Sequence, residues 1–240
     1  YMFLWNERAT ILSALWISVL VTVSGTVLGL ALTTTMGYVL SRPGFKLKGF
    51  YTWVVFIPMI FNGGMVASYV VNANILNMKN TIWALILPLA VSSFNIIVCK
   101  TFFRSTIPDS IIESAKIDGA SQLRIFGTIV LPISKPVLAT IGLFLTFGYW
   151  NDWFQSLLYI RQNKVLQPLQ ALLMELQNNV EYLNRMIGQM GTAAIMEAQR
   201  APNQTLRMAL VVMIVVPIAC AYPFFQRYIV AGLTIGSVKG

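Results

Sequence analysis

A short stretch near the middle of the sequence combines aromatic rings with polar groups: Tyr149, Trp150, Asn151, Asp152, Trp153 and Gln155. Aromatic faces pack against the apolar faces of sugar rings, while amides and carboxylates bond hydroxyl groups. These residues are therefore candidates for contacts with a sugar-like substrate. Asn62, beside Gly63 and Gly64, and Asn95 are weaker candidates. Two alternatives stay open: an aromatic belt at a membrane interface, which we favour for the tryptophans, and hydrogen bonds that join packed helices.

The sequence offers little for catalysis or metal binding. It has no histidine, and Cys99 and Cys220 each lie alone in an apolar run, as small buried hydrophobic residues usually do. Acidic residues do not cluster, and the nucleotide-binding pattern GxxxxGK[ST] is absent. We therefore expect no catalytic residue, no metal and no cofactor bound by this chain.

The composition indicates a protein surrounded by lipid. Of the 240 residues, 57% are hydrophobic and 10% are charged, whereas about one quarter of an average soluble domain is charged. Too few charges remain to cover the surface of a soluble fold of this size. The net charge of +9 is spread between apolar runs and forms no dense stripe, which argues against nucleic-acid binding.

Five segments are long and apolar enough to cross a bilayer, which takes about 20 helical residues. They are Thr10 to Leu40, Phe50 to Val71, Ile82 to Phe103, Pro136 to Ile160 and Leu206 to Val230. Backbone groups in lipid must pair within their own segment, so an open chain crosses as helices. We predict an all-α fold, a polytopic transmembrane helical bundle that forms one domain over residues 1–240.

Basic residues in the short loops set the orientation. The loop Ser41 to Gly49 contains Arg42, Lys46 and Lys48 and no acid, so it is predicted to be cytoplasmic. Residues 104–135 and the tail 231–240 then lie inside, and residues 161–207 outside. Tyr1 also falls outside, so we expect a preceding span that this sequence does not contain.

The cytoplasmic stretch 104–135 has the pattern of a helix, a tight turn and a helix. Pro108 and Asp109 signal the first start, and Gly119 signals its end. Ile111, Ile112 and Ala115 place an apolar stripe on this helix. A second helix is predicted to begin at Ser121 and to end at Pro132. On pattern alone, this hairpin could simply link two spans.

The residues of the hairpin are more specific than its pattern. Glu113, Ser114, Ala115, Asp118, Gly119, Ala120, Ile129, Leu131 and Pro132 resemble the EAA loop of the permeases of ATP-binding-cassette (ABC) importers. The resemblance implies that the first helix docks into a cleft of a cytoplasmic ATPase subunit. It also implies that Glu113 faces a basic group there and that Ala115 permits close approach. Ser114 departs from the alanine that the family often has.

The C-terminal tail carries a second resemblance. Gly232, Thr234, Gly236 and Lys239 follow the last span as in permeases of the maltose-transporter type, whose tail reaches between the two ATPase subunits. A basic anchor at the membrane surface is the alternative. Over most of its length the chain resembles the carbohydrate-importer permeases, in particular the oligosaccharide and complex-glycan branch of Gram-positive bacteria.

This resemblance implies several partners. They are a second, non-identical permease, two ATPase subunits that hold ATP and Mg, an extracytoplasmic solute-binding protein and the lipid of the bacterial cytoplasmic membrane. We expect the polar outer stretch 161–207, with a helical leucine pattern from Leu169 to Leu176, to contact the binding protein. A secondary transporter or channel is the alternative function. Charged residues are few within the predicted spans, Lys100 and Asp152 among them, which argues against an ion-coupling site.

Overall fold

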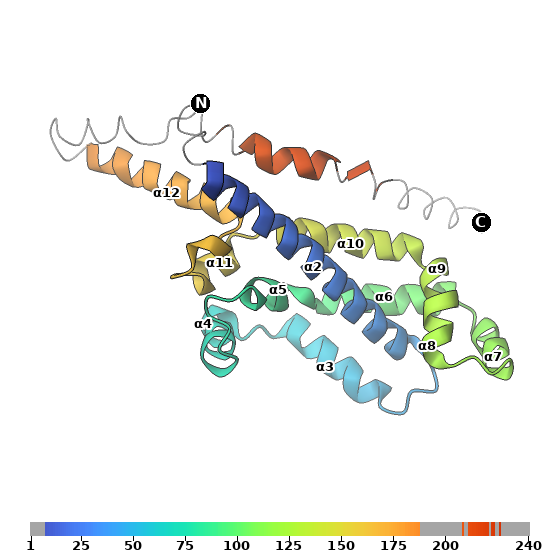
Figure 1. Ribbon diagram of the computed structural model, residues 1–240. Coiled ribbons are helices and arrows are strands. Elements are labelled where there is room, and N and C mark those ends of the chain that lie inside the picture. Colours follow the sequence, from blue (N-terminus) through green and yellow to red (C-terminus); the bar gives the residue numbers. More distant parts are fainter. Residues whose placement is uncertain (1–7, 188–207, 209–210, 221, 224–225, 227–240) are drawn as a thin grey trace. The chain divides into compact units, whose positions relative to one another are not determined.

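The computed structural model describes residues 8–187, 208, 211–220, 222–223 and 226 (Figure 1). Helices joined by short turns make up this described part, and no strand is assigned within it. The all-α prediction is confirmed. The four tail residues Gly232, Thr234, Gly236 and Lys239 lie outside the described residues.

Helix α2, Arg8–Ser41, is the longest element and matches the first predicted span. Its 34 residues extend well beyond the thickness of a hydrocarbon core, about 30 Å. Two glycines bring it close to its neighbours. A Cβ on Gly37 would lie 2.6 Å from Cβ of Cys99, and one on Gly29 would lie 2.9 Å from the carbonyl oxygen of Ala90. Small residues of this kind let helices in membranes approach backbone to backbone.

The second predicted span is broken, contrary to the expectation of one helix. It consists of α3, Lys48–Ile60, then α4, Gly64–Val70, and a π-helical turn, Val71–Ile75. Phe61 is extended and Gly64 has a φ of +81°. The side-chain oxygen of Asn62 accepts the N–H of Gly64 at 2.9 Å, so Asn62 stabilises the break. Hydropathy alone gave no sign of it.

Two further predicted spans are also interrupted. Helices α5, Trp83–Ala90, and α6, Ser93–Thr106, meet at a bend of 48°. Helix α10, Lys135–Trp150, is separated from α11, Phe154–Tyr159, by residues 151–153. In the described part, one helix is long and apolar enough to cross a membrane, or up to three if each bent pair counts as one span. The helix Val211–Cys220 covers part of the fifth predicted span.

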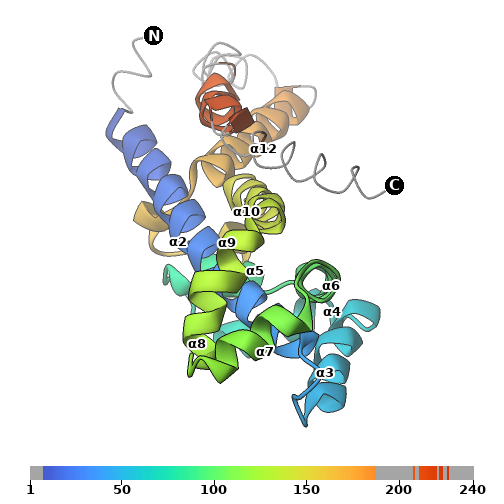
Figure 2. The ribbon, with the colours of Figure 1, turned by 90° about the vertical axis from the view of Figure 1, so that its right-hand side faces the viewer.

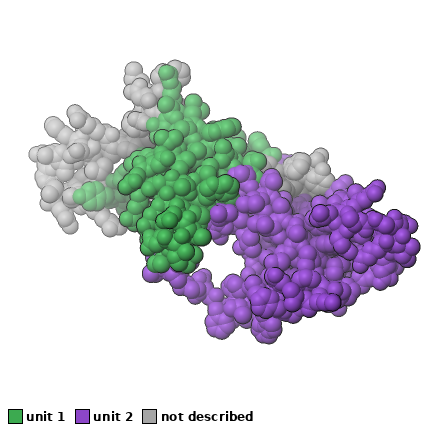
Figure 3. All heavy atoms as spheres, turned by 60° about the horizontal axis from the view of Figure 1, so that its bottom comes forward, with its two compact units in different colours: residues 1–23, 69–86, 147–221 green, residues 24–68, 87–146, 222–240 purple. Residues whose placement is uncertain are grey.

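The chain forms two compact units, each made from separate stretches of sequence (Figure 3). Unit 1 comprises residues 1–23, 69–86 and 147–221, and unit 2 comprises residues 24–68, 87–146 and 222–240. The main core of unit 1 is formed by Ile11, Ala14, Trp150, Leu169, Leu173 and Ile214. Unit 2 has a core around Leu40, Val55 and Ile96 and also contains the predicted cytoplasmic hairpin.

Candidate functional site

The hairpin predicted within residues 104–135 is present in the structure. Helix α7, Asp109–Ile117, begins after the extended residue Pro108. Helix α8, Gln122–Ile125, follows the turn and lies beside α7 (Figure 2). Asp109 in the first turn of α7 and Lys116 in its last turn both complement the helix dipole. Local signals at both ends therefore fix the length of α7.

The turn between the two helices depends on Gly119. This residue has a φ of +79°, a conformation that glycine adopts without steric cost. The N–H of Gly119 donates to the carbonyl of Lys116 at 3.0 Å, and that of Ala120 donates to the carbonyl of Ala115 at 2.9 Å. This pair of bonds is a Schellman motif, which satisfies carbonyls at a helix end. Gly119 thus ends the first helix, as the sequence predicts.

The second helix starts as predicted and runs to Ile133 through a change in its helical geometry. Ser121 caps it, with its hydroxyl oxygen accepting the N–H of Arg124 at 3.3 Å. The chain then continues through a π-helical turn, Phe126–Val130, and α9, Leu131–Ile133, and it bends by 84° before α10, so the helical run ends one residue beyond Pro132, close to the predicted stop. The N–H of Leu131 bonds to Phe126, five residues earlier. This wider turn accommodates the N–H that proline lacks.

The apolar stripe predicted on α7 does not face outward as a whole. Ile112, in the middle of this stripe, is only 3% exposed, because it packs inside this chain, so it is not available to a docking partner. The apolar side chains that do project lie at the tip of the hairpin, where Ile117 is 86% exposed and Leu123 is 82% exposed. Their positions on either side of the turn are visible in the sequence but were missed there.

Most residues of the predicted coupling set lie at the surface of this chain. Glu113, Ser114, Asp118, Gly119 and Pro132 are exposed, and Ala115, Ala120 and Leu131 are half-buried. Six of them come together around the Schellman turn: Glu113, Ser114, Ala115, Asp118, Gly119 and Ala120. Leu131 and Pro132 lie further along, in α9.

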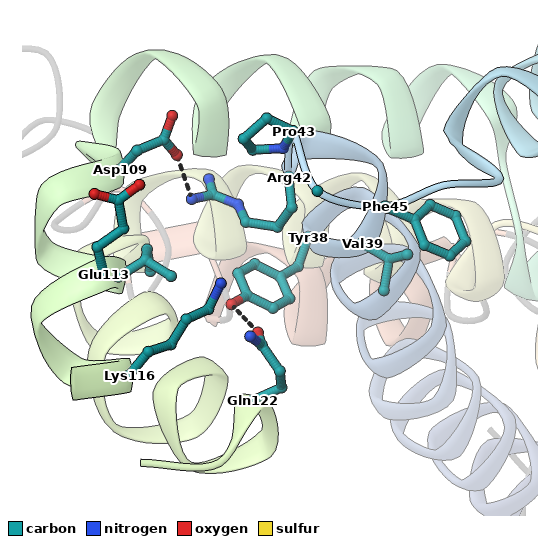
Figure 4. A pocket seen from close by; sticks show the side chains of 11 residues that line it. Tyr38, Val39, Arg42, Pro43, Phe45, Asp109, Glu113, Lys116 and Gln122 are labelled. Atoms are coloured by element: carbon teal, nitrogen blue, oxygen red, sulfur yellow. Dashed lines mark hydrogen bonds and ion pairs between the residues drawn. The ribbon is translucent and has the colours of Figure 1, made fainter. Parts of the chain in front are cut away.

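The end of helix α2 is tied to the start of α7 by Arg42 (Figure 4). One Nη of Arg42 pairs with the carboxylate of Asp109 at 3.1 Å, and the other donates to the carbonyl of Phe103 in the last turn of α6 at 3.2 Å. Nε donates to the hydroxyl of Ser41 at 3.0 Å. The Arg42 side chain is 12% exposed, whereas that of Asp109 is 59% exposed. Arg42 is thus anchored inside the chain and reaches outward to the hairpin.

Tyr38, one turn earlier in α2, contacts the second helix of the hairpin. Its hydroxyl donates to the side-chain oxygen of Gln122 at 3.1 Å (Figure 4). Its ring lies 5.1 Å from that of Phe126 and 6.4 Å from that of Phe103, centre to centre. The Arg42 guanidinium lies over the same ring at 5.4 Å. These contacts are of the kinds that stabilise aromatic packing and cation–π pairs.

A cavity of about 380 Å³ lies between the end of α2 and the hairpin. Besides Tyr38 and Arg42, its walls include the loop Pro43–Phe45 and, from α7, Ile112, Glu113 and Lys116. Figure 4 shows Glu113 on the same side of α7 as Asp109, and Lys116 extending toward Tyr38. The cavity combines two carboxylates, two cations and apolar walls. Among the described residues, no cluster of acids, histidines or cysteines is arranged to hold a metal.

Sequence reasoning found the hairpin but missed Arg42 and Tyr38 as parts of its site. Arg42 was used only to orient the chain, because its ion-pair partner lies 67 residues further along. Only the fold brings the two together.

Two of the predicted substrate contacts are part of the interior. Tyr149 is buried, and its hydroxyl donates to the carbonyl of Ile86 at 2.7 Å. Trp150 is buried in the main core of unit 1, and its Nε1 donates to the carbonyl of Ile214 at 3.0 Å. A buried Tyr or Trp usually pairs its polar atom in this way. The prediction that these two side chains face a substrate path is not supported.

The neighbouring candidates occupy the break between α10 and α11. Asn151 is exposed, and its amide donates to the carbonyl of Phe147 at 3.0 Å. The carboxylate of Asp152 accepts the N–H of Gln155 at 3.2 Å. Asp152, Trp153 and Gln155 are half-buried. Of the weaker candidates, Asn62 is exposed, but Asn95 is buried in α6.

The predicted outer stretch contains a 3₁₀ turn, Lys164–Leu166, followed by helix α12, Leu169–Ile187. Leu169 and Leu173 pack in the main core of unit 1, and the N–H of Leu169 donates to the hydroxyl of Ser18 at 2.8 Å. Glu175 accepts hydrogen bonds from Gln167 at 2.7 Å and from Lys164 at 3.0 Å. The Gln167 amide foremost, with Lys164, lowers the pKa of Glu175 below its ordinary value, against the opposing effect of burial. Residues 188–207 lie outside the described part.

Comparison with known proteins identifies the family to which this helical chain belongs. Residues 11–235 match the family described as binding-protein-dependent transport system inner membrane component. The chain belongs to this family. It is therefore a membrane component of a transport system that works with a binding protein, and it has the fold of an ABC-importer transmembrane domain.

Individual relatives cover nearly the whole chain. Protein LplC of Bacillus subtilis strain 168 is 40% identical over 96% of this chain and 75% of its own length. The polygalacturonan/rhamnogalacturonan transport system permease protein YtcP of the same organism is 38% identical over 96% and 78%. A crystal structure of a bacterial ABC transporter involved in import of the acidic polysaccharide alginate contains a similar chain. That chain is 26% identical with a TM-score of 0.76, covering 91% of this chain and 75% of the solved one.

Proposed function

We propose that this chain is the permease subunit of an ABC importer that takes up a sugar or oligosaccharide. YtcP and the arabinooligosaccharides permease AraQ of Halalkalibacterium halodurans, which is 29% identical over 95% of this chain, are named for oligomeric or polymeric carbohydrates. The alginate transporter handles an acidic polysaccharide. These likenesses support a carbohydrate as the substrate. Oligosaccharides that contain uronate are the first compounds to test.

The energy for transport comes from separate subunits in this proposal. ATP and Mg bind to two cytoplasmic ATPase subunits, and the hairpin docks into one of them through Glu113 and the residues around the Schellman turn. The single observation that carries this assignment is the exposure of Ile117 and Leu123 at the hairpin tip. Two large apolar side chains on a cytoplasmic turn favour a protein partner, because a partner that covers them removes their apolar surface from water, which is favourable.

The remaining partners follow from the same assignment. A second, different permease completes the translocation path in the bacterial cytoplasmic membrane, where both subunits cross several times. A solute-binding protein delivers the substrate to α12 and the outer stretch. The tail residues Gly232, Thr234, Gly236 and Lys239 contact the ATPase pair. Along the path we retain Asn151, Asp152, Trp153, Gln155 and Asn62, which are not fully buried in this chain.

Reconstitution of the assembled transporter with its binding protein tests this function. ATP hydrolysis and uptake are measured with oligogalacturonides, alginate oligosaccharides and the neutral trisaccharide raffinose. We expect ATP-dependent uptake of at least one carbohydrate, with no uptake when ATP is replaced by a non-hydrolysable analogue. Uptake driven by an ion gradient without ATP would contradict the proposal.

A further inference from the structure

Three helix ends meet at one side chain in unit 2. Arg42 directly follows the last residue of α2, bonds the carbonyl of Phe103 near the end of α6, and pairs with Asp109 at the start of α7. The ends of α2 and α6 are negative poles of helix dipoles, and the start of α7 is a positive pole that already carries a carboxylate. A guanidinium, with several donors in a fixed plane, suits this position better than an ammonium group does.

We propose that Arg42 is a positioning residue that passes movement of the docked hairpin to the ends of helices α2 and α6. This inference rests on the proposed docking of α7 on an ATPase subunit. Arg42 itself touches neither substrate nor ATP. Its role is to hold α7 in a fixed place against two helices, so that displacement of the hairpin displaces them as well.

The asymmetry of the Arg42–Asp109 pair supports this role. An exposed ion pair alone contributes little to stability. Arg42, however, is held on its inner side by the Phe103 carbonyl, the Ser41 hydroxyl and the face of Tyr38. The position of the guanidinium is thus set by the membrane helices, and Asp109 brings the hairpin to it.

A second contact also links the hairpin to α2. Tyr38 binds Gln122 in α8 and packs on Phe126 just beyond it. The hairpin is therefore held at both of its helices by neighbouring turns of α2. Because the hairpin is attached at two points, it does not rotate freely about either one. A movement of the hairpin therefore shifts the end of α2.

The test uses the assembled transporter with spin labels on Ser105→Cys, near the end of α6, and Arg124→Cys, in α8. Both positions are exposed and belong to unit 2. Cys99→Ala and Cys220→Ala remove the native thiols. Electron paramagnetic resonance then gives the spread of distances between the hairpin and α6. Arg42→Gln and Asp109→Asn are compared with Asp109→Glu and with Lys46→Gln, which removes a charge from the same loop without touching Arg42's partners.

We expect Arg42→Gln and Asp109→Asn to keep the ATPase subunits bound but to broaden the distances. Binding-protein-stimulated ATP hydrolysis, measured with the oligosaccharide that stimulates the wild type most, should fall about fivefold or more, the lower range of ordinary coupling between sites. Asp109→Glu and Lys46→Gln should resemble the wild type. Wild-type distances and stimulation in both Arg42→Gln and Asp109→Asn would overturn the inference. So would loss of the ATPase from both, which would make Arg42 a residue needed for hairpin folding alone. Failure of the wild type to bind any ATPase would instead refute the proposed function.

Discussion

Tyr38 lies in the last turn of α2 and Arg42 directly follows that helix, and each contacts a different helix of the hairpin. The residues are also in contact with each other, since the guanidinium lies 5.4 Å from the centre of the tyrosine ring. One short segment of a membrane helix therefore holds both halves of the element that we propose to dock on the ATPase.

Gly119→Val should impair docking through the backbone. A Cβ at Gly119 meets no atom within 4 Å, so any effect comes from its φ of +79°, which costs a β-branched residue about 1 kcal/mol or more. We expect fewer ATPase subunits to copurify with the variant. Gly127→Val is the matched control, because Gly127 also has open space but no positive φ. Equal copurification of both variants would remove the turn from the docking element.

Ile117→Ser and Leu123→Ser should weaken ATPase association without destabilising this chain. Both side chains project from the hairpin tip and lose almost no packing within the subunit. Ile112→Ser provides the contrast, because it opens the interior and should lower the melting temperature, with a cost of roughly 2–5 kcal/mol by analogy with other core truncations. Copurification and thermal melting separate the two effects. Undiminished ATPase binding by the double tip variant would count against an apolar docking surface.

Trp150→Phe should reduce stability and leave the apparent affinity for substrate unchanged. The variant loses the hydrogen bond from Nε1 to the carbonyl of Ile214, a contribution of about 1 kcal/mol. Trp153→Phe is the comparison, because Trp153 is only half-buried at the break between α10 and α11. Thermal melting and the KM for uptake are measured for both. If Trp150→Phe raises the KM and leaves the melting temperature unchanged, Trp150 contacts the substrate and the prediction is wrong.

Acid should loosen the start of α12 through Glu175. The pKa of this carboxyl is lowered in the folded chain, chiefly by its hydrogen bond from Gln167. Its stabilising contribution is therefore fully present above the unfolded value, about 4.3, and is lost as the pH falls through the lower folded value. Hydrogen exchange in α12 should rise over that range in the wild type. In Glu175→Gln it should be higher at neutral pH and should vary less with acid. Identical pH profiles would exclude Glu175 as the cause.

The exposed side of α12 should contact the solute-binding protein. Asn178 is exposed, and a photoreactive crosslinker on Asn178→Cys should capture the binding protein in an actively transporting complex. Leu173→Cys, in the buried face, serves as the negative control. If labels along the whole exposed face of α12 capture nothing, the binding protein docks elsewhere.

The sequence was most informative where structure depends on neighbouring residues. The length of α7 follows from Pro108, Asp109 and Gly119, and each acts within a turn of its own position. The all-α class and the continuity of α2 follow from hydrophobicity over a long window. These features needed no knowledge of the rest of the fold.

Features that depend on distant partners could not be predicted in the same way. Trp150 looks like a sugar-binding or interfacial residue until Ile214 is brought beside it. Arg42 looks like an orientation signal until Asp109 is brought beside it. The breaks in the predicted spans were missed for another reason: hydropathy measures side chains, whereas Phe61 and Gly64 interrupt α3 and α4 through their backbone angles.

The contact of Gly37 with Cys99 has a mechanical consequence. At this point α2 and α6 touch with almost no side chain between them, so any larger residue at position 37 would have to force them apart. A helix contact without a flexible side chain between the backbones deforms little, and close-packed interiors transmit strain for this reason. The two helices that Arg42 links at their ends are thus also clamped further along. We therefore expect a displacement of either helix near Arg42 to move the other with it.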